Sequence, residues 1–234
     1  MRLLILFIPF FSFIIPALLG RLLGRLGAAN YTIILMLSVL CVCIFSLYEI
    51  IFNNIIVTYS LWTWIIIDVF TIEIGLLFDF LSMLMSFLIV FISTLVHIYS
   101  YSYMSHDPFL PRFMAYLSLF TFFMLLLVTS SNFFQMFLGW EGVGVCSYLL
   151  INFWFTRVLA NKAALKAMIM NRIADVFFVI AIIYILNIFK TTDYTIVLNL
   201  IPFILNEKVI FFNLCFFKIN IICFFLFIVA IVKS

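Results

Sequence analysis

The sequence is short of charge: only 9% of its residues are Asp, Glu, Lys or Arg, whereas 68% are hydrophobic. A soluble domain needs a polar surface, which normally takes about a quarter of its residues as charged side chains. The shortage of charge therefore excludes a soluble globular protein. The apolar residues come in repeated runs of about 20, which is the length of a membrane-spanning helix. The sequence predicts an integral membrane protein built from helices.

Motifs for nucleotides, metals and nucleic acids are missing as well. The sequence contains neither GxGxxG nor GxxxxGK[ST], so it indicates no nucleotide site. Its two histidines have no cysteine or carboxylate at metal-ligand spacing, and no basic cluster with interleaved aromatics points to nucleic acid. The five cysteines lie in or beside apolar runs, where isolated cysteines are usually packing residues. They are Cys41, Cys43, Cys146, Cys215 and Cys223.

Six apolar runs are long enough to cross a bilayer. They cover about residues 3–19, 31–52, 80–100, 113–128, 133–155 and 163–188. The first run could be read as a signal peptide, but its two prolines and the lack of an A-x-A cleavage site favour a retained helix. A short polar loop is predicted at 20–30. We find no short internal repeat and no soluble domain, so residues 1–234 are predicted as one transmembrane domain.

Two segments are predicted as loops on the outer side of the membrane, 53–79 and 189–208. The first contains paired tryptophans that are typical of an interface, and its stretch VTYSLWTWIII has some strand character. Asp79, which follows the acidic residues Asp68 and Glu73, is interpreted as the start of the next helix.

The last apolar run, 209–232, is interrupted by Lys218 and Asn220. One interpretation is a half-helix over 219–232, about 21 Å long at about 1.5 Å per residue and ending at Lys233. That is shorter than the ~30 Å of hydrocarbon, as in the broken helices of transporters. The alternative is one continuous helix from residue 209 that buries Lys218.

The distribution of basic residues between the loops predicts an orientation. By the positive-inside rule, the odd-numbered loops face the matrix or cytoplasm and the N-terminus faces the outer compartment. The basic residues of the odd loops are Arg21, Arg25, Arg112, Arg157 and Lys162, against Arg2, Lys190 and Lys208 on the opposite side.

Several ionisable residues nevertheless lie inside the predicted spans. Such residues cost about 2.5–3.5 kcal/mol each at a helix centre and are by default candidates for function. Glu141 is ninth in the run 133–155, between glycines that let a neighbouring helix approach closely. Asp175 is near the centre of the next run. Asn171 and Arg172 lie four and three residues before it, so the three can form one polar cluster.

These charges have a structural and a functional interpretation. In the structural one, Arg172 and Asp175 neutralise each other and Glu141 is protonated and bonded to a carbonyl. Two mid-membrane acids followed by Lys233 favour the functional one, a proton relay. His97, inside the third run, is a further candidate for the relay. Lys166 is a candidate for the place where protons enter, or it extends to the interface with its neighbours.

Two long stretches carry a resemblance to a known family. FLGWEGVGVCSYLLINFW followed by NKAALKAMIMNRIADV, and VHIYSYSYMSHDPFLPRFMAYLSLFTFFMLLLVTSSNFFQMF before them, resemble chain 5 of NADH–ubiquinone oxidoreductase, respiratory complex I. The match is dense over about 76–176 and collinear on either side. Chains 2 and 4 of that complex and the large subunit of Mrp-type antiporters share the fold but not the WEGVG context.

The resemblance implies an all-α, antiporter-like polytopic bundle with six full transmembrane helices and a broken or half seventh. It implies that Glu141 is the family's glutamate of the fifth helix, and that Arg172 and Asp175 are the ion pair of the sixth. AIVKS maps Lys233 onto the family's lysine, although Val232 stands where the family usually has glycine. Glu141 and Lys233 would then form a switchable ion pair that moves protons, with energy from quinone reduction in other subunits.

It also implies a multi-pass protein of the mitochondrial inner membrane. NADH, FMN, iron–sulfur clusters and ubiquinone would be bound by other subunits, and none by this chain. Its partners would be other membrane-arm subunits and lipids. Family members run to many more helices, so we expect either a second chain, from a split gene, that supplies the rest, or that only part of a longer chain is represented. The rival functions are a stand-alone cation/proton antiporter subunit and a purely structural component.

Overall fold

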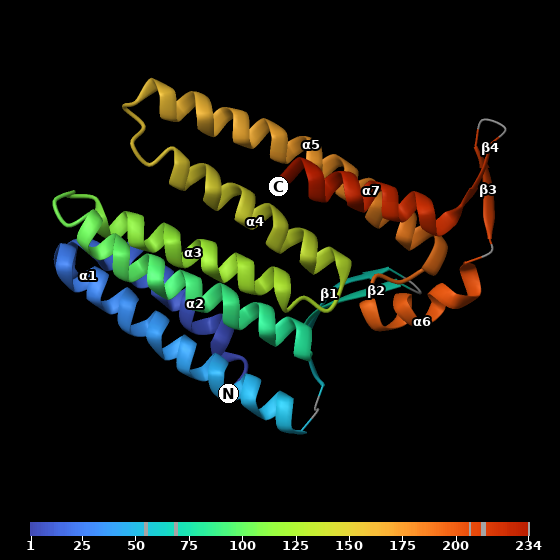
Figure 1. The fold of residues 1–234 in the computed structure, drawn as a ribbon, viewed down its shortest axis with the longest axis horizontal. Coiled ribbons are helices and arrows are strands. Elements are labelled where there is room, and N and C mark those ends of the chain that lie inside the picture. The colour runs from blue at the N-terminus through green and yellow to red at the C-terminus, as the bar shows by residue number, and fades with distance from the viewer. Residues whose placement is uncertain (54–55, 68–69, 206, 212–213, 234) are drawn as a thin grey trace.

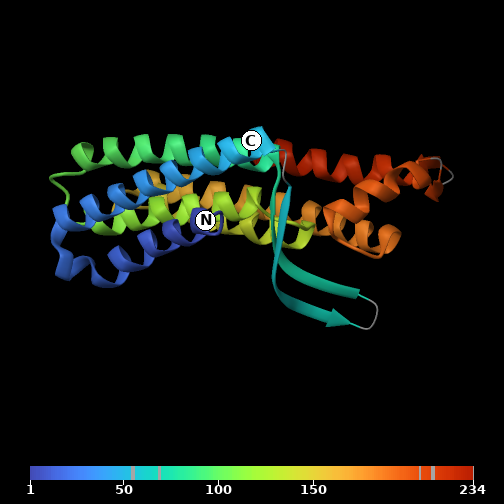
Figure 2. The same ribbon diagram turned by 90° about the horizontal axis from the view of Figure 1, so that it is seen from below.

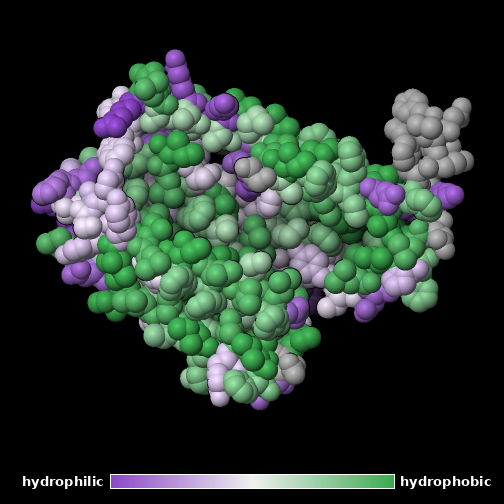
Figure 3. All heavy atoms as spheres, in the orientation of Figure 1, coloured by the Kyte–Doolittle hydropathy of each residue, from purple (hydrophilic) through white to green (hydrophobic). Residues whose placement is uncertain are grey.

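The computed structural model describes residues 1–53, 56–67, 70–205, 207–211 and 214–233. Its helices lie roughly side by side along one direction, with loops and hairpins at the two ends (Figure 1). Five of the described helices are long and apolar enough to cross a membrane. Hydrophobic side chains cover much of the visible middle of the molecule, while hydrophilic ones gather towards its ends (Figure 3). An all-α membrane bundle is therefore confirmed.

The first helix, α1 (Leu4–Asn53), is folded back on itself. Its backbone leaves the helical region only at Gly24, where φ is 72° and ψ is 173°. A positive φ is easily adopted only by glycine, so this residue permits the sharp reversal seen in Figure 2. The polar loop predicted over 20–30 is thus wrong, because Arg21 and the Gly27–Ala29 stretch stay helical and one glycine makes the turn. The number of membrane crossings stays a prediction.

Four further helices follow in up-and-down order. They are α2 (Phe80–Tyr103), α3 (Leu110–Val128), α4 (Phe133–Ile151) and α5 (Val158–Phe189). Asp79 is the N-cap of α2, as predicted, and its backbone N–H donates to Ser82 Oγ at 2.7 Å. Pro111 stands in the first turn of α3, where its missing N–H leaves no helical bond unmade. α1 packs against α2 and α3, and α3 packs in turn against α4.

The segment predicted as the first outer loop forms an antiparallel hairpin of β1 (Val57–Ile67) and β2 (Phe70–Phe78). The strand character of VTYSLWTWIII is confirmed, and Figure 2 shows the hairpin projecting to one side of the helices. Asp68 lies outside the described residues. The side of the membrane on which the hairpin stands remains a prediction.

The second predicted loop contains a helix. α6 (Tyr194–Ile204) is apolar and 11 residues long, too short to cross a bilayer as a helix at about 1.5 Å per residue. A small hairpin of β3 (Lys208–Phe211) and β4 (Leu214–Phe217) separates it from α7 (Lys218–Lys233). The continuous helix from residue 209 is therefore wrong, and a separate helix that begins close to Ile219 is confirmed. Lys218 forms an ion pair with Glu207, with 2.5 Å between Nζ and Oε2.

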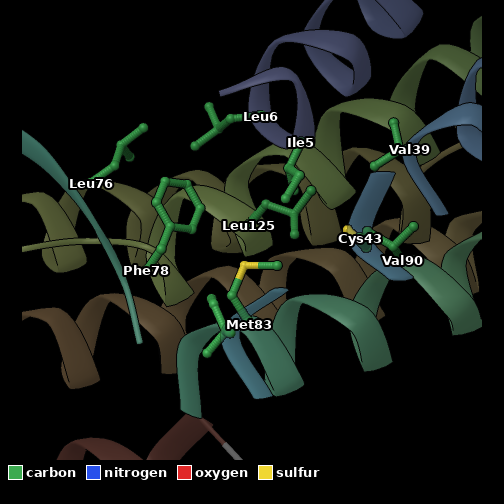
Figure 4. Packing of buried hydrophobic residues seen from close by; sticks show 10 residues of the cluster. Ile5, Leu6, Val39, Cys43, Leu76, Phe78, Met83, Val90 and Leu125 are labelled. Atoms are coloured by element: carbon green, nitrogen blue, oxygen red, sulfur yellow. The ribbon is translucent and has the colours of Figure 1, made fainter. Parts of the chain in front are cut away.

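The largest described core joins the first half of α1 to its neighbours (Figure 4). Ile5 and Leu6 from α1 meet Leu125 of α3 and Phe78 at the end of β2, and all four are almost fully buried. It is completed by Val39, Cys43 and Ile50 from the second half of α1, Met83 and Val90 from α2, and Leu76 from β2. This core makes one unit of the α1 hairpin, α2 and α3; α4 packs against α3, and α5 packs against α4.

Asn132, at the turn between α3 and α4, holds the first hairpin to this unit. It is fully buried, its Oδ1 accepts from Gln135 N at 2.8 Å, and its Nδ2 donates to the Glu73 carbonyl at 2.5 Å. We expect Asn132→Ala to cost about 1–2 kcal/mol, because a helix cap and a buried bond are lost together. The measurement is the midpoint of thermal unfolding. Asn161→Ala removes a single exposed bond to the Phe155 carbonyl and is the control, expected within about 0.5 kcal/mol of the parent protein. If Asn132→Ala and Asn161→Ala unfolded at the same midpoint temperature, the role of Asn132 in holding the hairpin would be contradicted.

Candidate functional site

Close packing of α3 on α4 fixes the position of Glu141. A Cβ atom added to Gly139 would lie 2.8 Å from the backbone of Leu127, and one added to Gly142 would overlap the ring of Phe123. The predicted role of these glycines in close helix approach is therefore confirmed. They face α3, and Glu141, between them in sequence, turns away from α3 towards α5. Its side chain is 37% exposed.

α5 presents three polar residues to Glu141. Arg172 Nη1 lies 3.7 Å from Glu141 Oε1, and Asn171 lies against Gly144, the next glycine of α4. Asp175, one turn further along, is 9% exposed and interacts electrostatically with both Glu141 and Arg172. Residues three and four apart share a helix face, so 171, 172 and 175 form the cluster that their spacing predicts.

α7 brings a second cation to the same place. Its C-terminal end lies midway along α5 and close to α4 (Figure 1). Lys233 Nζ donates to the Trp140 carbonyl at 2.7 Å and stands 3.9 Å from the centre of the Trp140 ring. It also interacts electrostatically with Asp175 and Glu141. α4, α5 and α7 thus contribute two acids and two bases to one site, whose formal charges cancel.

A small cavity opens between the acids. It has a volume of about 20 Å³ and is lined by Glu141, Gly144, Val145, Met168, Asn171, Arg172 and Asp175. A polar cavity of more than about 10–15 Å³ accommodates one water molecule. Such a water would contact Glu141, Arg172 and Asp175 at once. The arrangement can therefore hold a proton on either acid and pass it through one water.

The structure pairs the charges differently from the prediction. The resemblance implied the pairs Arg172–Asp175 and Glu141–Lys233, whereas the ion pair within this cluster, among the described residues, is Arg172 with Glu141. The physical reason is the placement of the helices: α4 packs on α5 with Gly144 against Asn171, which brings Glu141 within reach of Arg172. Lys233 takes the backbone carbonyl of Trp140, the residue before Glu141. The roles of the four residues in a relay stay predictions.

His97 lies elsewhere, buried in the bundle of α1, α2 and α3. Its Nδ1 is 2.7 Å from the Ser93 carbonyl and its Nε2 is 3.2 Å from Ser118 Oγ, which is 2.8 Å from Ser12 Oγ. A carbonyl only accepts, so Nδ1 carries a proton and donates it. In the part of the chain that the structure describes, His97 has no hydrogen bond or ion pair with the four charged residues, and its place in a relay stays a prediction.

Lys166 is not brought into the cluster either. It is exposed on α5 and lines a separate hollow together with Lys162, Leu165, Ile169 and Met170. That position suits a residue that extends its charge towards the interface, and a role where protons enter stays a prediction.

The sequence analysis missed Trp140. Both its carbonyl and its ring hold Lys233, and the ring packs at 5.6 Å against that of Phe178 on α5. Every residue has a carbonyl, so the sequence carries no signal for that contact. Its position directly before Glu141 was the only available hint.

Comparisons with known proteins first define the class. Residues 130–234 match the family described as NADH:quinone oxidoreductase/Mrp antiporter, TM, and residues 64–114 match NADH-Ubiquinone oxidoreductase (complex I), chain 5 N-terminus. The fold is similar to a chain of the membrane-bound sulfane sulfur reductase, an archaeal respiratory membrane complex. That likeness has a TM-score of 0.73 at 16% identity, and covers 84% of this chain and 39% of the other. The antiporter-like fold is confirmed.

Individual relatives then give the particular family. The chain is 47% identical over 98% of its length to NADH-ubiquinone oxidoreductase chain 5 of Phytophthora infestans, and 44% identical over its full length to that of Metridium senile. It spans 35% and 37% of the length of these two relatives. The chain belongs to the family of NADH-ubiquinone oxidoreductase chain 5. The resemblance found from WEGVG and its flanks is confirmed.

Proposed function

We propose that this chain forms part of a proton-translocating membrane subunit of an NADH:ubiquinone oxidoreductase, a respiratory complex I. The observation that carries the proposal is one water-sized cavity lined by Glu141, Arg172 and Asp175, with Lys233 held beside it on the Trp140 carbonyl. Four ionisable groups are too costly within apolar helices to serve packing alone, where small or apolar residues would suffice. The family relationship supplies the reaction to which proton movement is coupled.

In the proposed mechanism, Glu141 exchanges partners. In the described state it is paired with Arg172, while Lys233 is held by the Trp140 carbonyl and the charge of Asp175. The side chain of Arg172 is 61% exposed, so it has room to swing away. Glu141 would then be free to attract Lys233, its neighbour across Trp140. When Arg172 returns to Glu141, Lys233 loses this counter-ion in a low-dielectric site and gives up its proton more readily, and Asp175, which interacts with Lys233 and lines the cavity, would receive it.

Partners follow from the exposure of these charges. Arg172 and Glu141 are partly open to the outside of the bundle, and a charge that faces lipid at mid-membrane costs about 2.5–3.5 kcal/mol. We therefore propose that further protein covers this face. It would come from membrane-arm subunits of the complex or from polypeptide that completes the antiporter unit, including a second chain from a split gene.

The proposal also assigns a location and leaves the redox groups elsewhere. We propose a multi-pass protein of the mitochondrial inner membrane with its N-terminus on the outer side, and NADH, FMN, iron–sulfur clusters and ubiquinone bound by other subunits. Among the described residues, no group of three or more His, Cys, Asp or Glu side chains could hold a metal ion. Proton movement would be this chain's contribution to the enzyme.

The experiment that tests the function is Glu141→Gln in the assembled complex. Glutamine keeps the size of the side chain but cannot exchange a proton, so we expect NADH-driven proton uptake into vesicles to fall by about 10²-fold or more. The matched control is Glu49→Gln, which breaks the Arg2–Glu49 pair at 3.4 Å, far from the cavity along the sequence and outside its lining. We expect this control to pump like the parent complex.

Three outcomes separate the candidate functions. Loss of pumping with the complex assembled supports the relay. Unchanged pumping in Glu141→Gln would establish a structural component instead. Cation/proton exchange by the chain without NADH, and its absence from any NADH-oxidising complex, would establish the stand-alone antiporter, an interpretation that the family relationship does not favour.

A further inference from the structure

A second, larger cavity lies at the turn of the α1 hairpin. It shares no lining residue with the cavity at Glu141. It has a volume of about 820 Å³ and is formed where the turn of α1 at Gly24 meets the start of α3. Gly20 makes this junction possible, because a Cβ there would lie 3.0 Å from Pro111 Cβ. Its volume is within the range of about 300–1,000 Å³ that is usual for small-ligand sites.

Three arginines line this cavity: Arg21 and Arg25 on either side of the α1 turn, and Arg112 in the first turn of α3. Among the described residues, no carboxylate lines the cavity and none lies within 4 Å of these guanidinium groups. The cavity is therefore strongly cationic and its charges are not compensated by the protein. An anion is the occupant that such a site favours.

Arg112 is held in a defined position. Its Nε donates to Tyr116 Oη at 2.7 Å, and its guanidinium carbon lies 5.3 Å from the centre of the Tyr116 ring. The two Nη groups remain for a ligand. A guanidinium that presents two parallel N–H groups matches the oxygens of a phosphate in a bidentate manner.

The rest of the lining is apolar, with Leu18 and Phe109 beside the arginines. These side chains are 76% and 57% exposed, so hydrocarbon has access to the same cavity. Figure 2 shows the α1 turn and the α2–α3 loop at the same end of the bundle, and the cavity is lined by residues from both. When the helices span a membrane, this end lies at the level of the headgroups. Cationic and apolar side chains next to one another fit a lipid better than a soluble anion, because a lipid has both a charged headgroup and hydrocarbon chains.

We propose that this cavity binds the phosphate headgroup of an anionic membrane phospholipid, with its acyl chains along Leu18 and Phe109. Basic pockets between helices at the predicted inner surface are the kind of site that anionic headgroups occupy. The arginines clamp the phosphate, and the lipid joins the α1 turn to the α2–α3 loop. This site is independent of the proton relay and does not require the proposed function.

The test uses the intact membrane complex in phosphatidylcholine vesicles that contain a photoactivatable phosphatidylglycerol. Cross-links are expected at residues 16–25 and 108–116. In the triple variant Arg21→Gln, Arg25→Gln, Arg112→Gln, we expect this labelling to fall by at least about tenfold. The control is Arg157→Gln with Lys162→Gln, two basic residues at the start of α5 that do not line the cavity. Equal labelling of the triple variant and the control would overturn the proposal.

Two further arms use the unmodified complex, so the test does not depend on the folding of a variant. Unlabelled phosphatidylglycerol is expected to compete with the photoactivatable lipid, and equal competition by added phosphatidylcholine would overturn the proposal. An excess of inorganic phosphate at constant ionic strength is expected to compete poorly. Complete displacement by phosphate would identify a site for the free anion and not for a lipid.

Discussion

In a complex that carries Lys233→Met, we expect NADH-driven proton translocation to fall by about 10²-fold or more while the complex stays assembled. Methionine keeps the length of the side chain and fills the same space beside Trp140. It removes the charge that is bound to the Trp140 carbonyl and interacts with Asp175 and Glu141. The measurement is the rate of vesicle acidification at a matched rate of NADH oxidation.

Lys218→Met is the matched control, because Lys218 stands at the opposite end of the same helix. Within the described part of the chain, its Nζ is paired with Glu207 and forms no ion pair with the cluster around Glu141. An exposed ion pair of this kind is worth little, so we expect pumping to change by less than about twofold. If both variants lost pumping equally, α7 would matter as a packing element and Lys233 would have no special part in proton transfer.

The largest expected effect on stability comes from Gly139→Ala. The new methyl group would lie 2.8 Å from N and Cα of Leu127, which are backbone atoms that cannot rotate away. α3 and α4 must then separate, at a cost of about 1–3 kcal/mol. We expect the temperature at which half of the chain remains assembled to fall by roughly 2–4 °C for each kcal/mol.

Gly27→Ala is the control, and its effect on thermal stability is expected to be neutral or of the opposite sign. The nearest atom to a Cβ at Gly27 is Leu23 Cβ, at 3.8 Å, so the methyl group fits. Alanine is favoured over glycine inside a helix by about 0.8–1 kcal/mol, and this variant should be unchanged or slightly more stable. A Gly139→Ala complex as heat-resistant as Gly27→Ala would show that α3 and α4 are not in the close contact described.

The membrane class, the helical bundle and the cluster on α5 were predictable from local pattern. Apolar runs set the helices, and the spacing of Asn171, Arg172 and Asp175 sets their common face. Two local features were harder to predict. The reversal of α1 depends on one glycine in an otherwise helical stretch, and α6 lies in a segment whose polar flanks suggested a loop.

The pairing of charges could not be predicted, because it depends on how neighbouring helices are placed. Arg172 could pair with Asp175, three residues along its own helix, or with Glu141 on the neighbouring helix. The sequence allows either ion pair. The close approach of α4 to α5, with Gly144 against Asn171, decides for Glu141. The partner of Lys233, a backbone carbonyl, has no sequence signal at all.

The sequence by itself determined that this chain enters a membrane, which residues carry charge into it, and to which family it belongs. Those properties depend on composition and on long local strings, and both are unaffected by how the chain folds. Only the tertiary structure decided that α4 and α5 line one cavity with Lys233 of α7 beside it, and that three arginines from two distant segments line another. Such sites arise from packing between helices, because the glycines that permit close approach fix which side chains meet.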